Sequence, residues 1–375
     1  MVKTLSFGTV LVAGALLAAP VSAEPAVTVG AIEILSGPSA AYGTAIKAGL
    51  ELALAEINAA GGVLGGRKLE LVIEDSAGNK DQAVNAARRL IGQNKVPAII
   101  GPTLSNEMFA VGPVTNERKV VTIGTSNTAK GITDIGPYIF RTSLPEADVV
   151  PVTLAAARDK FGVKTIAMMY ANDDAFSKSG FDSMKAAADK LGLTIAAIES
   201  FSGKDTDFSA QLTKIKGLKV DAITVSALVE PTSGVVLQAR QLGIPASIRF
   251  IGGNGANSPK LGEIAGEAAD GLLVGSPWFI AKPDPANQAF VAGFNKSYGK
   301  DPDQFAAQAY DTLHILAKAI DRAGNTDSDS IRESLLKTSY TGVIGPFSFT
   351  AGRDPASTEG VVVLTMQGGK FQILK

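Results

Sequence analysis

The sequence predicts an α/β protein made of two units, each with a parallel-core sheet covered by helices. Apolar runs typical of strands alternate with amphipathic helical patterns over most of the 375 residues. The alternation restarts near Pro145 without a long linker, and the elements after Trp278 have no complete sheet of their own. Strands that alternate with helices in this way indicate parallel sheets with helices on both faces.

The first 23 residues are typical of a secretory signal peptide. Lys3 is followed by an apolar stretch over 7–19 and by small residues, so cleavage is expected after Ala23. A transmembrane anchor is the alternative interpretation, but the apolar stretch is short for a membrane span.

The first unit begins with the strand-like run VTVGAIEIL and a long helix that ends at Gly61-Gly62. Ile46, Leu50 and Ile57 fall on one stripe of this helix, which predicts that the stripe packs against a sheet. The remaining elements are KLELVIED, a helix over about 80–93, VPAII, a helix from about Ser105, VVTIGT and YIFRTS.

The second unit begins with a helix near Pro145. It continues through KTIAMMYA, a helix in SMKAAADKLG, LTIAAIES, a helix over 207–217, DAITVSA, a helix in VVLQARQLG, IRFIGG and DGLLVGSPW. Helical patterns at 287–298, 304–323 and about 328–336 follow, then the strand-like GVVVLTM and KFQIL. These last elements must join the two existing units, so we expect the chain to cross between the units more than once.

Composition excludes several classes of function. The net charge is −1 and no basic run is present, which argues against a nucleic-acid partner. The chain has no cysteine, so it has no thiol nucleophile, no thiolate metal site and no lipid anchor through cysteine. The single histidine, His314, lies in a helical pattern and no nucleotide or calcium-loop fingerprint occurs. We therefore expect no enzyme activity, no cofactor and no metal.

Loops rich in Gly, Ser, Thr and Asn follow the predicted strands in both units. They are SGPSAAYG, GPTLSN, GTSNT, ANDDAFSKSG, ALVEPTSG and GGNGANS. Ligands of open parallel sheets bind beyond the carboxyl ends of the strands, and helix N-termini there attract anions. Ser105 either caps its helix or offers its hydroxyl and N–H to a ligand carboxylate, or does both. The recurrence of such loops predicts one shared ligand cleft.

From Val27 to the C-terminus the chain resembles the periplasmic leucine/isoleucine/valine-binding proteins, the type I solute-binding components of ABC importers. The segments that carry the resemblance are SGPSAAYG, GLELALAEINAAGGVLGGRKLELVIEDSAGN, AIIGPTLSN, YIFRT and GFNKSYGKDP with AAQAYD. The resemblance implies two Rossmann-like lobes, 24–143 plus 278–350 and 144–277 plus 351–375, joined by three crossovers. It also implies a periplasmic monomer that closes on a ligand and meets permease and ATPase subunits of the inner membrane.

The resemblance also implies a set of ligand-binding residues. In this family the serine after the IIGP strand and the following loop hold the ligand carboxylate, and aromatic side chains lie near the ligand. The candidates are Tyr42, Leu104, Ser105, Gly124, Thr125, Ser126, Phe176, Leu228, Glu230, Asn254 and Trp278. Trp278 either lines the cleft or packs in the hinge.

Two positions differ from the family pattern. Asn254 stands where amino-acid binders have an acidic residue for the ligand ammonium, and Leu228 replaces a tyrosine. Glu230 either turns inward to supply the missing charge or stays at solvent or a helix N-terminus. A buried charge without a partner costs several kcal/mol, so the ammonium site is expected to be weakened or lost.

The expected function is therefore that of a solute-binding protein for a small carboxylate-bearing ligand. The ligand is a branched-chain or hydrophobic amino acid, or a related aromatic or branched organic acid. The alternative is a ligand-sensing protein of the same fold that feeds a receptor or regulator.

Overall fold

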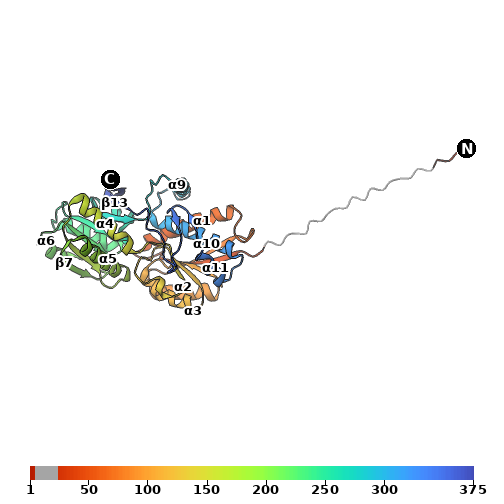
Figure 1. Cartoon of the computed structure of the whole chain (residues 1–375), viewed down its shortest axis with the longest axis horizontal. Coiled ribbons are helices and arrows are strands. Elements are labelled where there is room, and N and C mark those ends of the chain that lie inside the picture. The colour runs from red at the N-terminus through yellow and green to blue at the C-terminus, as the bar shows by residue number, and fades with distance from the viewer. Residues whose placement is uncertain (5–23) are drawn as a thin grey trace.

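The computed structural model describes residues 1–4 and 24–375, and the predicted signal peptide lies, beyond its first four residues, outside the described residues. Two lobes lie side by side, with α4, α5 and α6 in one lobe and α1–α3, α10 and α11 in the other (Figure 1). In the described part of the chain no helix has the length and apolar character needed to cross a membrane.

The first lobe is built on a five-stranded sheet with the order β2-β1-β3-β4-β5. Every neighbouring pair in it is parallel. The central strand β3 is buried along its whole length, which explains why its sequence reads as an unbroken apolar run. The strands are β1 (Val27–Glu33), β2 (Leu69–Asp75), β3 (Ala98–Ile100), β4 (Val121–Gly124) and β5 (Ile139–Arg141).

Helices from both ends of the described chain complete this lobe. They are α1 (Ala40–Ala59), α2 (Lys80–Gly92), α3 (Ser105–Glu117), α9 (Pro285–Tyr298), α10 (Gln304–Ala323) and α11 (Ser328–Leu335). The long helix α10 packs along α1, so segments far apart in sequence form one layer (Figure 1). Gly49 permits this approach, because a Cβ at that position would lie 2.1 Å from the carbonyl oxygen of Ala306. A short hairpin, β11 (Tyr340–Thr341) and β12 (Pro346–Phe347), follows.

The second lobe contains a seven-stranded sheet with the order β14-β13-β10-β9-β8-β6-β7. Its five-stranded core is parallel, and β13 and β14 add antiparallel strands at one edge. The strands are β6 (Thr165–Ala171), β7 (Thr194–Phe201), β8 (Ala222–Ser226), β9 (Arg249–Gly252), β10 (Leu273–Ser276), β13 (Val362–Gln367) and β14 (Lys370–Ile373). Its helices are α4 (Glu146–Phe161), α5 (Ala175–Leu191), α6 (Ser209–Lys216), α7 (Val229–Gln241) and α8 (Lys260–Ala265).

Among the described residues, three connections cross between the lobes: β5 to α4, β10 to α9 and β12 to β13. Arg141 at the end of β5 and Asp354 in the third connection form an ion pair with an Nε–Oδ1 distance of 2.5 Å. The predicted fold class, two α/β lobes with parallel-core sheets joined by three crossovers, is confirmed. The exact lobe boundaries at 143, 277 and 350 stay a prediction.

Candidate functional site

A narrow cavity lies between the two lobes, where loops from the carboxyl ends of both sheets meet. It is lined by Tyr42, Thr103, Leu104, Ser105, Ser126, Thr128, Phe176, Leu228, Asn254, Gly255 and Phe305. Its volume of about 20 Å³ is little more than a single water molecule needs. A larger ligand can therefore enter only when the lobes move apart.

Ser105 opens α3 and faces this cavity. The N-cap of the helix is Leu104, whose N–H donates to the Glu107 side chain, so the capping role predicted as one alternative for Ser105 is wrong. The Ser105 hydroxyl instead accepts a hydrogen bond from the Ala129 N–H at 3.4 Å, which leaves its own proton available. Since the first N–H groups of a helix have no intrahelical acceptor, this end of the cavity suits an anion.

Buried carboxyl groups lie behind the loop that carries Ser105. The Thr103 hydroxyl donates to Glu33 Oε2 at 2.5 Å, and the Leu104 N–H donates to Glu107 Oε2 at 3.1 Å. Burial raises the pKa of Glu33 well above its usual value and that of Glu107 to about 7. These contacts fix the loop without placing either carboxyl group on the cavity wall.

The loop after β4 contributes Ser126 and Thr128, whereas Gly124 and Thr125 do not line the cavity. The Ser126 hydroxyl donates to the carbonyl oxygen of Thr103 at 2.6 Å, which joins this loop to the one before α3. Gly124 has a steric role instead, because a Cβ there would lie 2.1 Å from Asn127 Oδ1.

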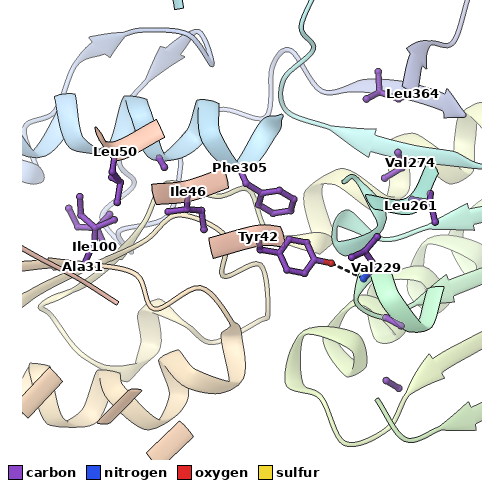
Figure 2. Packing of buried hydrophobic residues seen from close by; sticks show 14 of the residues in the cluster. Ala31, Tyr42, Ile46, Leu50, Ile100, Val229, Leu261, Val274, Phe305 and Leu364 are labelled. Atoms are coloured by element: carbon purple, nitrogen blue, oxygen red, sulfur yellow. Dashed lines mark hydrogen bonds between the residues drawn. The ribbon is translucent and has the colours of Figure 1, made fainter. Parts of the chain in front are cut away.

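Tyr42 on α1 bridges the two lobes beside the cavity (Figure 2). Its hydroxyl donates to the carbonyl oxygen of Gly255 at 2.6 Å and accepts the Val229 N–H at 2.7 Å. The ring packs edge-on against Phe305 with centroids 4.9 Å apart. With Phe176 from α5, these rings give the cavity an apolar wall.

Asn254 follows β9 and lines the cavity from the second lobe. Its Oδ1 accepts a hydrogen bond from Gln304 Nε2 at 2.7 Å, and its N–H donates to Glu146 Oε1 at 3.0 Å. The Thr128 hydroxyl donates to the same carboxylate oxygen at 3.3 Å. Burial raises the pKa of Glu146 to about 7, and no acidic side chain among the described residues lines the cavity itself.

The remaining candidates divide between the cavity and its surroundings. Leu228 lines the cavity, but Glu230 lies in the first turn of α7 outside the lining, where burial raises its pKa. Trp278 is also outside the lining: it is buried against Phe290 and donates from Nε1 to Asn287 Oδ1 at 2.7 Å. It therefore packs next to the second crossover.

Four residues of the cavity wall were not among the candidates: Thr103, Thr128, Gly255 and Phe305. The first three occur in loops that the sequence marked as strand ends, so those loops were found but not the individual residues. Phe305 lies at the start of α10, and its place beside Tyr42 follows only from the packing of α10 on α1.

Comparison with known proteins identifies the fold family. A family model of periplasmic binding proteins matches residues 26–370. The chain belongs to the periplasmic binding protein family. Among its relatives is the leucine-, isoleucine-, valine-, threonine- and alanine-binding protein of Pseudomonas aeruginosa, 30% identical over 318 residues that cover 84% of this chain and 83% of that protein. The resemblance to leucine/isoleucine/valine-binding proteins is confirmed.

Solved members of this family show the same fold with different ligands. The branched-chain amino acid transporter substrate-binding protein of Streptococcus pneumoniae, solved with isoleucine, is 30% identical, with a TM-score of 0.87 over 93% of this chain and 99% of that one. A solute-binding protein of an ABC transporter from Rhodopseudomonas palustris, solved with 3,4-dihydroxybenzoic acid, is 25% identical, with a TM-score of 0.83 over 92% of this chain and 95% of that one.

Proposed function

We propose that this chain is a periplasmic solute-binding protein that carries a small carboxylic acid to an ABC permease, and that this acid has no charged amino group. The observation that carries the proposal is Asn254, whose amide stands on the cavity wall where an amino acid would need a carboxylate. Catalysis is not part of this function, because a binding protein releases its ligand unchanged.

One end of the cavity suits the carboxylate of the ligand. Ser105 brings a hydroxyl group with a free proton to this end, and α3 directs its first N–H groups to the same place. Ser126 and Thr128 line this end too, with their protons donated to Thr103 O and Glu146 Oε1. Hydrogen bonds to a charged carboxylate are about twice as strong as those between neutral groups. The other walls are apolar, with Phe176, Leu228 and Phe305 placed to pack against a branched or aromatic tail.

The cavity offers little to an ammonium group. Asn254 Oδ1 already accepts from Gln304 Nε2, and Glu230 lies outside the lining. Glu146 is the acidic group behind Asn254, but it does not line the cavity: its Oε1 accepts from the Asn254 N–H and the Thr128 hydroxyl, and its Oε2, unpaired among the described residues, is buried. An ammonium group buried here would lack the paired charge that offsets its loss of water.

The two-lobed fold supports a carrier that opens and closes. The lobes meet through hydrogen bonds such as Tyr42 Oη to Gly255 O, so separating them exposes the cavity. We propose that the closed monomer docks on permease and ATPase subunits of the inner membrane after export and cleavage at Ala23. A sensor of the same fold would keep the same cavity but pass its signal to a receptor.

The relatives favour a second candidate ligand, a branched-chain amino acid, because the names of the Pseudomonas and Streptococcus proteins specify such ligands. Under this alternative the ammonium group would bind without a carboxylate partner at Asn254. The two candidates differ in one charged group, so they can be separated by direct measurement.

The test is isothermal titration of the exported chain with leucine and with 4-methylpentanoate, which has the same carbon skeleton without the amino group. We expect 4-methylpentanoate to bind at least about tenfold more tightly, a difference of about 1.4 kcal/mol. Mass spectrometry of the natively purified protein should also detect a co-purified organic acid. Tighter binding of leucine would refute the proposal.

A further inference from the structure

Gln304, the first residue of α10, connects the first lobe to the loop that carries Asn254. Its side chain is buried, with 2% exposed. Its Nε2 donates to Asn254 Oδ1 at 2.7 Å, and its Oε1 accepts from Asn257 Nδ2 at the same distance. The three amides therefore form a chain of hydrogen bonds across the gap between the lobes.

In this arrangement one end of the Asn254 amide is left free. Because Oδ1 points at Gln304, the Nδ2 group is left, and within residues 24–375 it donates to no acceptor. Asn254 lines the cavity, so at this position the wall presents an N–H donor. A donor group repels an ammonium ion and attracts an oxygen acceptor.

The backbone of Asn254 lies close to the carboxylate end of the cavity. The Asn254 N–H and the Thr128 hydroxyl both donate to Glu146 Oε1, at 3.0 and 3.3 Å. The Ala129 N–H, one residue further along, reaches Ser105 Oγ at 3.4 Å. Asn254 thus lies beside the hydroxyl-rich end of the cavity and not opposite it. A ligand with its carboxylate at the Ser105 end would place the carbon atom bonded to that carboxylate next to Asn254.

We propose that the site selects carboxylic acids with an acceptor oxygen on carbon 2, that is 2-oxo and 2-hydroxy acids with a branched or aromatic tail, and that Gln304 determines this selectivity by orienting Asn254. The inference rests on the proposed function, since it assumes that the carboxylate occupies the Ser105 end. Gln304 does not line the cavity, so it is a positioning residue that acts through Asn254.

The test uses three ligands that share one tail: 4-methyl-2-oxopentanoate, 4-methylpentanoate and leucine. Isothermal titration of the exported chain should give roughly tenfold tighter binding for the 2-oxo acid than for the unsubstituted acid, the size of one good hydrogen bond. Leucine should bind most weakly. Equal binding of both acids with weaker binding of leucine would overturn the inference and leave the proposed function intact. Tightest binding of leucine would overturn both.

Two substitutions test the role of Gln304. Gln304→Met keeps a long side chain but removes the amide, so the Asn254 amide is free to rotate and the affinity ratio of the 2-oxo acid to the unsubstituted acid should fall toward one. Gln304→Glu offers only acceptors, which should draw Asn254 Nδ2 away from the cavity and bring the ratio to one or below. A general loss of stability would lower both affinities but would not change their ratio.

Gln308→Met is the matched control, because Gln308 lies one turn further along α10, is equally buried and does not line the cavity. This control should keep the tenfold ratio. If the affinity ratio of the 2-oxo acid to the unsubstituted acid is unchanged in Gln304→Met and Gln304→Glu, the role of Gln304 is overturned. If Gln308→Met also loses this ratio, the effect is not specific to the Asn254 contact, and the role of Gln304 is overturned as well.

Discussion

Replacing Glu146 with glutamine should change how the stability of the protein depends on pH. Glu146 is buried at the start of α4, and its Oε2 has no hydrogen-bond partner among the described residues. Burial raises its pKa from 4.5 to about 7, against the lowering effect of the Asn254 N–H and the Thr128 hydroxyl. Glutamine keeps one acceptor oxygen for these two donors and has no charge to bury.

The sign follows from the direction of the shift. In the folded state the pKa of Glu146 is raised above its unfolded value, so the folded protein holds this proton more tightly. The associated stability is fully present below about pH 4 and is lost as the pH rises toward 7. With the pKa raised from 4.5 to about 7, burying the charged form of Glu146 costs about 3 kcal/mol.

The assay is urea unfolding of the wild-type chain and Glu146→Gln at pH 4 and pH 8. We expect the free energy of unfolding of the variant, relative to wild type, to increase by about 3 kcal/mol between the two pH values. Glu117→Gln is the control, since Glu117 is exposed on α3, and its difference from wild type should stay within about 0.5 kcal/mol. If the difference for Glu146→Gln is the same at both pH values, the burial argument is refuted.

Three further substitutions test the site and the connections around it. Tyr42→Phe leaves the Gly255 carbonyl and the Val229 N–H of the second lobe unpaired when the lobes close. The affinity for 4-methylpentanoate, measured by titration calorimetry, should therefore fall about tenfold, and an unchanged affinity would contradict the bridging role of Tyr42. Asn254→Asp supplies the missing carboxylate, so leucine should gain at least about tenfold in affinity while 4-methylpentanoate loses affinity; no gain for leucine would count against the assignment of this position. Arg141→Met breaks the ion pair with Asp354 and should lower the free energy of unfolding in urea by at least about 2 kcal/mol. A decrease below about 0.5 kcal/mol would show that this ion pair does not stabilise the fold.

The order of the main helices and strands along the chain can be predicted from the sequence, because strands and helices of a buried parallel sheet have different apolar patterns. Strand β3 is buried on both faces and reads as a continuous apolar run, whereas the helices carry one apolar stripe. The order of strands within each sheet does not follow, since it depends on tertiary pairing. The two-residue strands β11 and β12 and the short helix α8 are too short to show a period.

The candidate site could be predicted only in part, for a related reason. Loops at the carboxyl ends of strands converge by the geometry of the sheet, so Ser105, Ser126 and Asn254 could be expected near one another. Thr128 was missed because the sequence does not reveal that Ser126 and Thr128 line the cavity while Asn127 between them does not. Gln304 acts from a distant helix, and only the folded structure places its amide next to Asn254.

The contacts between the lobes separate two kinds of residue around the cavity. Asn106 Nδ2 donates to Asp174 Oδ1 at 2.8 Å and the Lys130 N–H donates to Ser179 Oγ at 2.8 Å, away from the cavity wall. In the open state these groups bind water instead, so the contact to Ser179 favours closure by only about 0.5–1.5 kcal/mol and the contact to the Asp174 carboxylate by about 1.5–3 kcal/mol. Substitutions there should change the affinity for every ligand by a similar factor, since they alter only the closing equilibrium. Substitutions at Asn254 or its partner Gln304 alter what the wall offers to the ligand, and so they should change the ratio of affinities between ligands.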